Sequence, residues 1–360
     1  MKMNRKTSLG ILLLAVLVML LLPGCQSQAS VSAVPTKTIV DCLDREVVIP
    51  ENPQRVACLY ASTAHMVTML DEEDKIVGIP NGIKRDVLMA YKLPNLDSLS
   101  VPFQDGAINI EELLATDTDL VLIRQSTAEN QGEIEKLDKA GIPWVVVDYA
   151  SLDGLKKAVT VTGAIFNQQE KAAGYNAYVQ KTLDLVTARV SLIPETSRVR
   201  VYHAVNEAAR TDLDGDLCSQ ITAVAGVINV STQGGSLITD AEKTMTTLEQ
   251  IYVWNPDAII ANDINATKYM LSDPKWSGLG AVARQQVTTL PVGVTRWCHP
   301  GSMEPHMAAL FIAMHFYPEQ FTDIDLAKTT RDYYKQWFDL NLSDDDVSAI
   351  LSGAGMRLEK

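Results

Sequence analysis

The chain has few of the residues on which catalysis and metal binding most often depend. Its 360 residues include only five cysteines and five histidines, and no CxxC pair occurs. The zinc motif His-Glu-x-x-His and the hydrolase motif Gly-x-Ser-x-Gly are missing too, and no paired-carboxylate motif stands at a useful spacing. These absences count against a metalloenzyme built on Cys298, His299 and His203, which is the one enzymatic alternative that the residues suggest.

Positive charge is also scarce. The chain has 31 lysines and arginines against 44 aspartates and glutamates, a formal net charge of −13. Nucleic acids and anionic lipid surfaces are therefore poor partners, because their phosphates are repelled. Long apolar runs are missing after the first 24 residues, so no later segment is expected to span a membrane. A chain of this length with 47% hydrophobic residues can build two domains.

The one long apolar run, Ile11–Leu22, follows Lys2, Arg5 and Lys6. It is shorter than the roughly 20 residues that a spanning helix needs, which predicts a secretory signal peptide over residues 1–24. Its removal takes away three positive charges and changes the net charge from −13 to −16.

The end of this segment, Leu22-Pro23-Gly24-Cys25, resembles a bacterial lipobox. The resemblance implies that Cys25 is diacylated and becomes the new N-terminus, so that two acyl chains hold the protein on the outer face of a membrane. Whether that membrane is the inner or the outer one stays open. Residues 25–37 are rich in Ser, Gln, Ala and Thr, which predicts a flexible tether.

From Thr38 onward, short β-branched runs alternate with longer helical patterns, which indicates βαβ units and parallel sheets. The sequence predicts an N-terminal α/β lobe over 38–151, a connecting helix over 152–193, a C-terminal α/β lobe over 194–325 and a helical segment over 326–360. The fold class is thus α/β, with two Rossmann-like lobes joined by a single long helix. Predicted strands are Arg55–Leu59, Lys75–Gly78, Asp119–Ile123, Trp144–Val147, Arg198–Tyr202, Asp257–Ile260 and Gln286–Leu290.

Ligands of open α/β sheets bind beyond the carboxyl ends of the strands. The residues that follow the predicted strands mix arginines, aromatic residues and one histidine, which suits a bulky anionic complex better than a bare cation. His203 and Tyr60 follow the first strand of each lobe, and imidazole and phenolate both bind iron. The expected ligand-binding residues are Tyr60, Arg124, Tyr149, His203, Arg296, Trp297 and His299.

The segment Thr295–Glu304 holds the densest group of functional side chains and precedes an apolar helix. Ser302 is a plausible N-cap and Pro305 suits the first turn. We expect this helix N-terminus to add backbone N–H donors for an anion in the cleft.

Five segments of the sequence, in the order in which they occur, resemble segments of the class III solute-binding proteins of ABC importers. These proteins capture siderophores, haem, cobalamin and related metal complexes. The resemblance covers nearly all of residues 38–355. It is carried by Val48–Val56, Lys75–Ile79, Ala225–Val230, Trp254–Ile260 and Pro300–Pro305.

The resemblance implies a receptor without enzymatic activity that takes an iron complex (a siderophore, haem or related chelate) into the cleft between its lobes. It has no intrinsic cofactor, is expected to be monomeric, and delivers its cargo to a permease and its ATPase. Any metal contact, through His203 or Tyr60, is made by way of the bound complex. A corrinoid, an oxyanion such as molybdate and a free metal ion stay open as cargo.

The resemblance also implies that one acidic residue in each lobe docks the permease. By position these are Glu111 and Glu249. A second interpretation is that both are solvated glutamates favoured by the dipoles of their helices. The scattered Cys42, Cys58, Cys218 and Cys298 suit either one or two disulfides or isolated buried thiols, and Cys298 is the one cysteine that we consider a possible ligand.

Overall fold

The computed structural model describes residues 34–240 and 243–358. The predicted signal peptide and Cys25, the predicted site of lipidation, lie outside the described residues. In the part of the chain that is described, no helix combines the length and the apolar character that crossing a membrane requires.

Each lobe is built on a four-stranded parallel sheet. The N-terminal sheet has the order β4-β3-β7-β8, and the C-terminal sheet has the order β11-β9-β14-β15. Numbered by their place in the lobe, the strands follow the order 2-1-3-4 in both, so the predicted similarity of the two lobes is confirmed. The strands are β3 (Val56–Cys58), β4 (Ile76–Gly78), β7 (Leu120–Ile123), β8 (Trp144–Val146), β9 (Arg200–Ala204), β11 (Ile228–Asn229), β14 (Ala258–Ala261) and β15 (Val287–Thr289).

The remaining described strands form three antiparallel sheets at the margins, the pairs β1-β2 and β5-β6 and the three-stranded sheet β10-β13-β12. The hairpins β5-β6 and β12-β13 precede helices with corresponding positions in the two lobes, α4 and α10. The predicted tether ends two residues early, because Thr36 and Lys37 already pair with Pro50 and Ile49. These strands are β1 (Thr36–Val40), β2 (Glu46–Pro50), β5 (Phe103–Gln104), β6 (Ala107–Ile108), β10 (Arg210–Thr211), β12 (Ile238–Asp240) and β13 (Lys243–Met245).

Helices cover both faces of the sheets. Those of the N-terminal lobe are α2 (Ala61–Met69), α3 (Val87–Lys92), α4 (Ile110–Ala115), α5 (Gln125–Ala128), α6 (Gln131–Ala140) and α7 (Leu152–Phe166). The remaining helices are α8 (Gln169–Val190), α9 (Leu217–Val224), α10 (Leu248–Trp254), α11 (Ile264–Ser272), α12 (Gly280–Ala283), α13 (Pro305–Phe316), α14 (Leu326–Phe338) and α15 (Asp344–Ser352).

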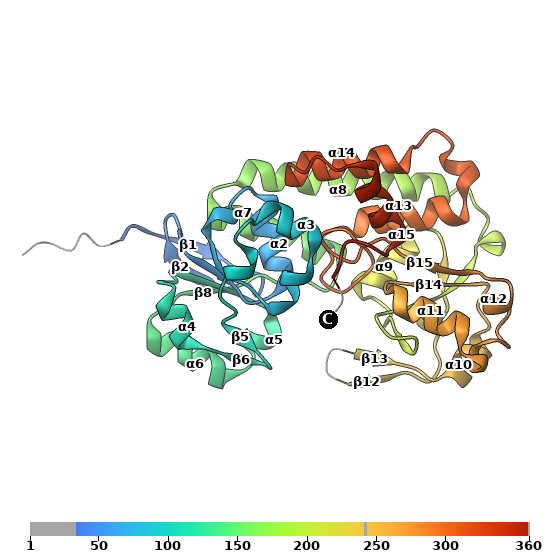
Figure 1. Cartoon of the computed structure of the whole chain (residues 1–360), viewed down its shortest axis with the longest axis horizontal. Coiled ribbons are helices and arrows are strands. Elements are labelled where there is room, and N and C mark those ends of the chain that lie inside the picture. The colour runs from blue at the N-terminus through green and yellow to red at the C-terminus, as the bar shows by residue number, and fades with distance from the viewer. Residues whose placement is uncertain (1–33, 241–242, 359–360) are drawn as a thin grey trace, which may run out of the picture. The chain divides into compact units, whose positions relative to one another are not determined.

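The connection between the lobes differs from the prediction in one respect. Residues 152–193 form two helices, because Asn167 takes a left-handed conformation (φ 59°) and ends α7. A Cβ on Gly163 of α7 would lie only 2.6 Å from the Cβ of Ala172 on α8, so the two helices pack closely. The single long helix that joins the lobes is therefore α8, which runs along one side of the body beside α14 (Figure 1).

Alternate residues of each central strand enter different hydrophobic clusters. Val56 and Cys58 of β3 face the large cluster that includes α8 and α13, whereas Ala57 faces the opposite side of the sheet. In the same way Val201 of β9 faces the large cluster and Tyr202 the other side. This alternation decides the orientation of the side chains near the strand ends.

The C-terminal segment returns to the N-terminal lobe. The N–H of Val87 donates to the carbonyl of Met356 at 3.2 Å, and the N–H of Leu358 donates to the carbonyl of Arg85 at 2.9 Å. Arg357 forms an ion pair with the buried Asp86. These contacts bring Arg85 and Arg357, far apart in sequence, to the same place.

Candidate functional site

The central strands of both lobes deliver polar residues to one cleft. Tyr60 and Arg124 stand just after β3 and β7, the first and third strands of the N-terminal lobe. Asn206 and Asp263 stand just after β9 and β14, the corresponding strands of the C-terminal lobe. In a sheet of this strand order the connections diverge between the first and third strands, and this point is where ligands bind. The prediction that the site lies at the strand ends therefore agrees with the cavities found there.

Two adjoining cavities share Asn206. The first, named here the Tyr60 cavity, has a volume of about 560 Å³ and is lined by Tyr60, Arg124, Gln125, Ser126, Glu129, Asp148, Asn206, Arg210, His299 and Pro300. The second, the Arg296 cavity, has a volume of about 780 Å³. Its lining residues are Arg85, Asn206, Asn262, Asp263, Ile264, Asn265, Lys268, Val292, Arg296, Gly353, Ala354, Gly355, Arg357 and Leu358.

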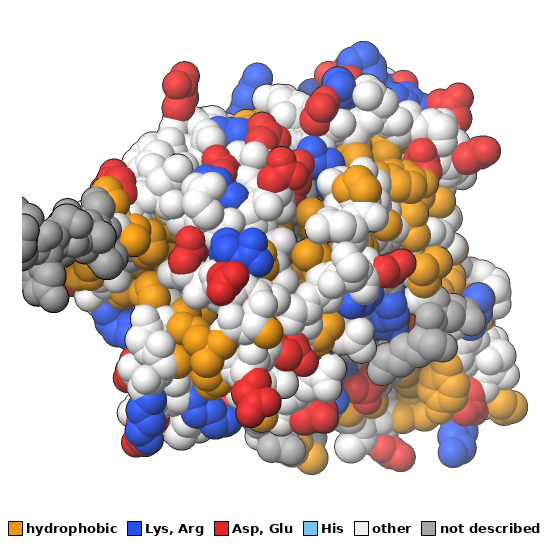
Figure 2. Space-filling view, turned by 60° about the vertical axis from the view of Figure 1, so that its left-hand side comes forward, with side chains coloured by type: hydrophobic (Ala, Val, Ile, Leu, Met, Phe, Trp, Pro, Cys, Tyr) orange, Lys and Arg blue, Asp and Glu red, His pale blue; other side chains and the backbone are white. Residues whose placement is uncertain are grey.

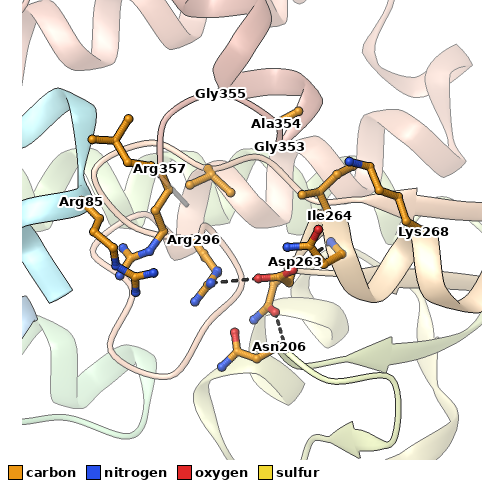
Figure 3. A pocket seen from close by; sticks show the side chains of 14 residues that line it. Arg85, Asn206, Asp263, Ile264, Lys268, Arg296, Gly353, Ala354, Gly355 and Arg357 are labelled. Atoms are coloured by element: carbon orange, nitrogen blue, oxygen red, sulfur yellow. Dashed lines mark hydrogen bonds and ion pairs between the residues drawn. The ribbon is translucent and has the colours of Figure 1, made fainter. Parts of the chain in front are cut away.

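Positive charge gathers in the Arg296 cavity. Figure 3 shows the guanidinium groups of Arg85, Arg296 and Arg357 turned toward the same space, and Arg296 pairs with Asp263 at 2.9 Å. Burial and the nearby charge of Arg357 lower the pKa of Arg296, although Asp263 partly opposes this effect. On the face drawn in Figure 2, by contrast, acidic and basic side chains are interspersed. The cavity is therefore an electropositive region on an acidic protein.

His299 is a neutral group among these cations. Its Nε2 lies 3.1 Å from the amide nitrogen of Asn206. Burial, followed by the charge of Arg296, lowers the pKa of His299 to about 3. At neutral pH its imidazole therefore offers a lone pair or an N–H to a ligand without adding charge.

Tyr60 spans the gap between the lobes. The guanidinium carbon of Arg124 lies 5.3 Å from the centre of the Tyr60 ring, a cation–π contact. A Cβ on Gly301, which has φ +83°, would lie 2.8 Å from the Tyr60 hydroxyl. Glycine at position 301 thus allows the Tyr60 hydroxyl to reach the loop that carries His299. Tyr60, Arg124, His299 and Arg296 are the predicted ligand-binding residues that the structure brings to the cleft.

The structure corrects the prediction for His203. Strand β9 continues to Ala204, two residues beyond the predicted end, so His203 lies within the strand and not after it. Its side chain is fully buried on the face of the sheet that Val201 also occupies, and its Nδ1 contacts Asp212 at 2.8 Å. The predicted metal contact of His203 with a bound complex in the cleft is therefore wrong. Asn206 takes the place in the cleft that the prediction gave to His203.

Tyr149 and Trp297 are also placed in the interior. Tyr149 is 8% exposed, and burial raises the pKa of its hydroxyl well above the ordinary value. Trp297 is fully buried, and its indole N–H donates to the Tyr334 hydroxyl at 3.1 Å. Neither side chain is placed to hold a ligand in the cleft, because the hydrophobic cluster between the lobes takes both rings.

The sequence predicts that the N-terminus of α13 opens into the cleft, and the structure contradicts this prediction. Pro305 occupies the first turn as predicted, but the N-cap is Glu304 and not Ser302. Ser302 and Glu304 are both fully buried, and the Glu304 N–H donates to the Ser302 hydroxyl. Protein groups therefore occupy this helix end.

The residues proposed for docking lie at equivalent places in the two lobes. Glu111 and Glu249 are the second residues of α4 and α10, and both side chains are exposed. Each stands eight positions before an aspartate, Asp119 or Asp257, whose carboxylate accepts a backbone N–H at the start of the neighbouring strand. Figure 1 places α4 and α10 away from α8.

Sequence reasoning missed several cleft residues. Arg210 lies in a marginal strand, and Arg85 follows β4 by seven residues. Arg357 arrives from the C-terminal segment, and Lys268 lies within α11. No local pattern marks these residues, since only the path of the chain brings them to the strand ends. The cysteines within the described ranges are free thiols, so a disulfide between them is not formed here.

Comparison with known proteins agrees with this geometry. The model of the periplasmic binding protein family matches residues 56–292, well over half of the chain. Molybdate-binding protein MolA of Haemophilus influenzae is 25% identical over 353 residues, covering 91% of this chain and 98% of that protein. The ABC transporter substrate-binding lipoprotein YvrC of Bacillus subtilis, itself uncharacterized, is 22% identical over 330 residues, covering 88% and 100%.

Solved structures share the fold. MolA bound to molybdate superposes with a TM-score of 0.75 and 23% identity, covering 85% of this chain and 99% of that chain. CeuE of Helicobacter pylori with Ni(II) bound gives a TM-score of 0.71 and 22% identity, covering 88% and 99%. The chain therefore belongs to the periplasmic binding protein family, whose members are extracytoplasmic binding proteins of transporters and not enzymes.

Proposed function

We propose that this protein is the receptor of an ABC importer and that its cargo is an anionic metal complex such as an iron chelate. The observation that carries the proposal is the electropositive cleft. Arg85, Arg296 and Arg357 converge there on a chain whose net charge is −13. Burial and then the charge of Arg357 lower the pKa of Arg296, and a bound anion opposes both effects. Guanidinium groups bind carboxylates and other oxyanions with paired hydrogen bonds.

The size of the cleft supports a chelate over a single small ion. The two cavities measure about 560 and 780 Å³, within the range of about 300–1,000 Å³ that holds drug-sized ligands. Tyr60 and His299 add a phenol and a neutral imidazole, which are ligands that iron accepts. In this proposal the metal enters with the complex, and the protein needs no cofactor of its own to bind it.

A small oxyanion is the second candidate. It is favoured by the similarity to MolA, which is named for molybdate. Arginines and the amides of Asn206 and Asn262, all lining the Arg296 cavity, can donate hydrogen bonds to such an ion. In this case only part of the cleft is occupied.

The remaining parts of the proposal concern the partners. Cys25 carries the lipid anchor, and a monomer presents Glu111 and Glu249 to a permease that works with its ATPase. The exposed positions of the two glutamates and their equal places in the two lobes support this arrangement.

The proposal is tested by titrating the purified protein with a panel of ligands while following intrinsic fluorescence and thermal unfolding. The panel contains ferric citrate, a ferric catecholate siderophore, haem, cobalamin, molybdate and Ni²⁺. Saturation with a cognate ligand at 100 times its Kd adds about 2.7 kcal/mol to the free energy of unfolding. We expect a ferric chelate to give this effect. Molybdate alone would select the second candidate, whereas cobalamin or Ni²⁺ alone would contradict an anionic cargo.

Substitutions identify the residues that hold the cargo. Arg85→Gln and Arg296→Gln are each expected to weaken binding at least about tenfold, the loss of one charge-assisted contact of about 1.4 kcal/mol. Arg331→Gln on α14 is the matched control, because Arg331 pairs with Asp344 and lines neither cavity. Equal affinities for all three variants would exclude the Arg296 cavity as the binding site.

A further inference from the structure

A second group of reactive side chains lies beneath the cleft, outside the residues that line it. His203 of β9, Cys218 of α9 and Cys298 of the loop before α13 are all fully buried. One ring nitrogen of His203 and the two sulfur atoms lie within 4.8 Å of one another. Three elements that are distant in sequence thus place two thiols and an imidazole around one point.

Contacts of its Nδ1 atom with Asp212 fix the orientation of the His203 ring. Its Nδ1 lies 2.8 and 3.0 Å from the two carboxylate oxygens of Asp212, and the amide of Asn229 donates to the same carboxylate at 2.6 Å. With Nδ1–H donating to Asp212, the lone pair of a neutral ring is on Nε2. This Nε2 is buried and, apart from the neighbouring Cys298 thiol, has no hydrogen-bond partner among the described residues. A carboxylate that holds the far nitrogen of a histidine is the arrangement commonly found behind histidines that bind metals.

We propose that His203, Cys218 and Cys298 bind one thiophilic metal ion, either Zn²⁺ or the softer ion Cu⁺. Cysteine sulfur and imidazole nitrogen are the donors that both ions prefer. Carboxylate oxygens of Asp212 and Asp216 lie within 4.8 Å of the Cys218 sulfur, so an oxygen donor is near for a fourth position. Bond lengths of about 2.0–2.3 Å require the three donors to move slightly inward. The ion would stabilise the thiolate forms of Cys218 and Cys298 and would bind Nε2 of His203.

The ion is separate from the cargo and has a structural consequence. The carbonyl of Cys298 accepts a hydrogen bond of 2.9 Å from Asn262, which lines the Arg296 cavity, and His299 follows Cys298 directly. Holding Cys298 to β9 and α9 therefore fastens the loop that presents Arg296 and His299 to the cleft. A disulfide between the two cysteines would join the same elements but would leave Nε2 of His203 without a partner.

The test is the metal content of the full chain, purified under reducing conditions and incubated with Zn²⁺ or, separately, with Cu⁺. We expect one ion per chain by elemental mass spectrometry and protection of two thiols from alkylation. With Co²⁺ as a probe, thiolate-to-metal charge-transfer absorption should appear. No retained ion, or a Cys218–Cys298 disulfide in the mass of a tryptic digest, would overturn the proposal.

Variants locate the ion. Cys218→Ala and Cys298→Ala should lose it, and Asp212→Asn should weaken the affinity about 10–100-fold. Cys58→Ala is the matched control, because Cys58 is an equally buried free thiol on β3 of the other lobe. Arg296→Gln should keep the ion even where it loses the cargo, which separates this proposal from the proposed function. Retention of the ion by both cysteine variants would contradict the site.

Discussion

At the scale of single residues, His306 shows how burial controls charge. Both of its ring nitrogens are buried and find no hydrogen-bond partner within residues 34–240 and 243–358, and its ring contacts Tyr175, Tyr178 and Tyr333. Burial lowers the pKa of His306 to about 3, whereas an unfolded chain titrates near 6.5. Between these two pKa values, His306 is protonated in the unfolded state and neutral in the folded state. The free energy of unfolding therefore falls as the pH decreases through this window.

We predict that His306→Phe reduces this acid sensitivity. The contribution of one histidine is about 1.4 kcal/mol per pH unit inside the window, and phenylalanine removes it while keeping the aromatic contacts. The measurement is urea unfolding from pH 7 to pH 4 for both proteins. Since packing alone can change stability at every pH, the slope against pH is the quantity compared. Parallel slopes would show that His306 is not held neutral in the folded state.

At the scale of elements, Glu304 joins the start of α13 to the loop that carries Arg296. Its carboxylate accepts the N–H of Val294 at 3.2 Å, the N–H of Thr295 at 2.8 Å, and hydroxyl groups of Thr295 and Tyr334. All four partners donate, so the fully buried side chain must supply acceptors only.

We predict that Glu304→Gln destabilises the protein by about 1–3 kcal/mol. The amide NH₂ that replaces one oxygen faces donors, so at least one buried group loses its hydrogen bond. Urea unfolding measures the change, with Glu319→Gln as the control, because Glu319 is exposed just after α13. A variant as stable as the wild type would mean that this network does not hold the loop.

At the scale of the whole molecule, the two lobes offer a pair of equivalent acidic positions. Because Glu111 and Glu249 are exposed in separate lobes, a partner that binds both must contact the protein at two points. We predict that Glu111→Arg and Glu249→Arg each reduce transport by the reconstituted permease, and that the double variant abolishes it. Ligand affinity should stay unchanged, because neither glutamate lines the Tyr60 or Arg296 cavity.

Reconstitution in proteoliposomes with the ATPase measures this effect as ligand-stimulated ATP hydrolysis. Glu195→Arg, a change at another exposed glutamate, serves as the control for the added charge. Full activity of the double variant would favour the other interpretation, in which the two glutamates only stabilise the N-termini of their helices.

Much of the fold follows from local patterns. The alternation of β-branched runs with helical patterns predicted seven of the eight strands of the two parallel sheets to within two residues, but it missed the short β11. Strand ends such as Tyr60 and Arg124 were recognised as cleft residues. An error of two residues at the end of β9 was nevertheless enough to misplace His203, because a buried strand is apolar on both faces and its end has no sharp signal.

The sequence by itself indicated two α/β lobes of similar build and predicted a ligand site at the strand ends, since both inferences depend on periodicity along short segments. Only the tertiary structure decided which charges meet there. Arg85 and Arg357 face Arg296 because the C-terminal segment pairs with the N-terminal lobe, and His203 meets Cys218 and Cys298 because three elements pack together. Such contacts depend on the path of the whole chain, and no pattern within a short segment predicts that path.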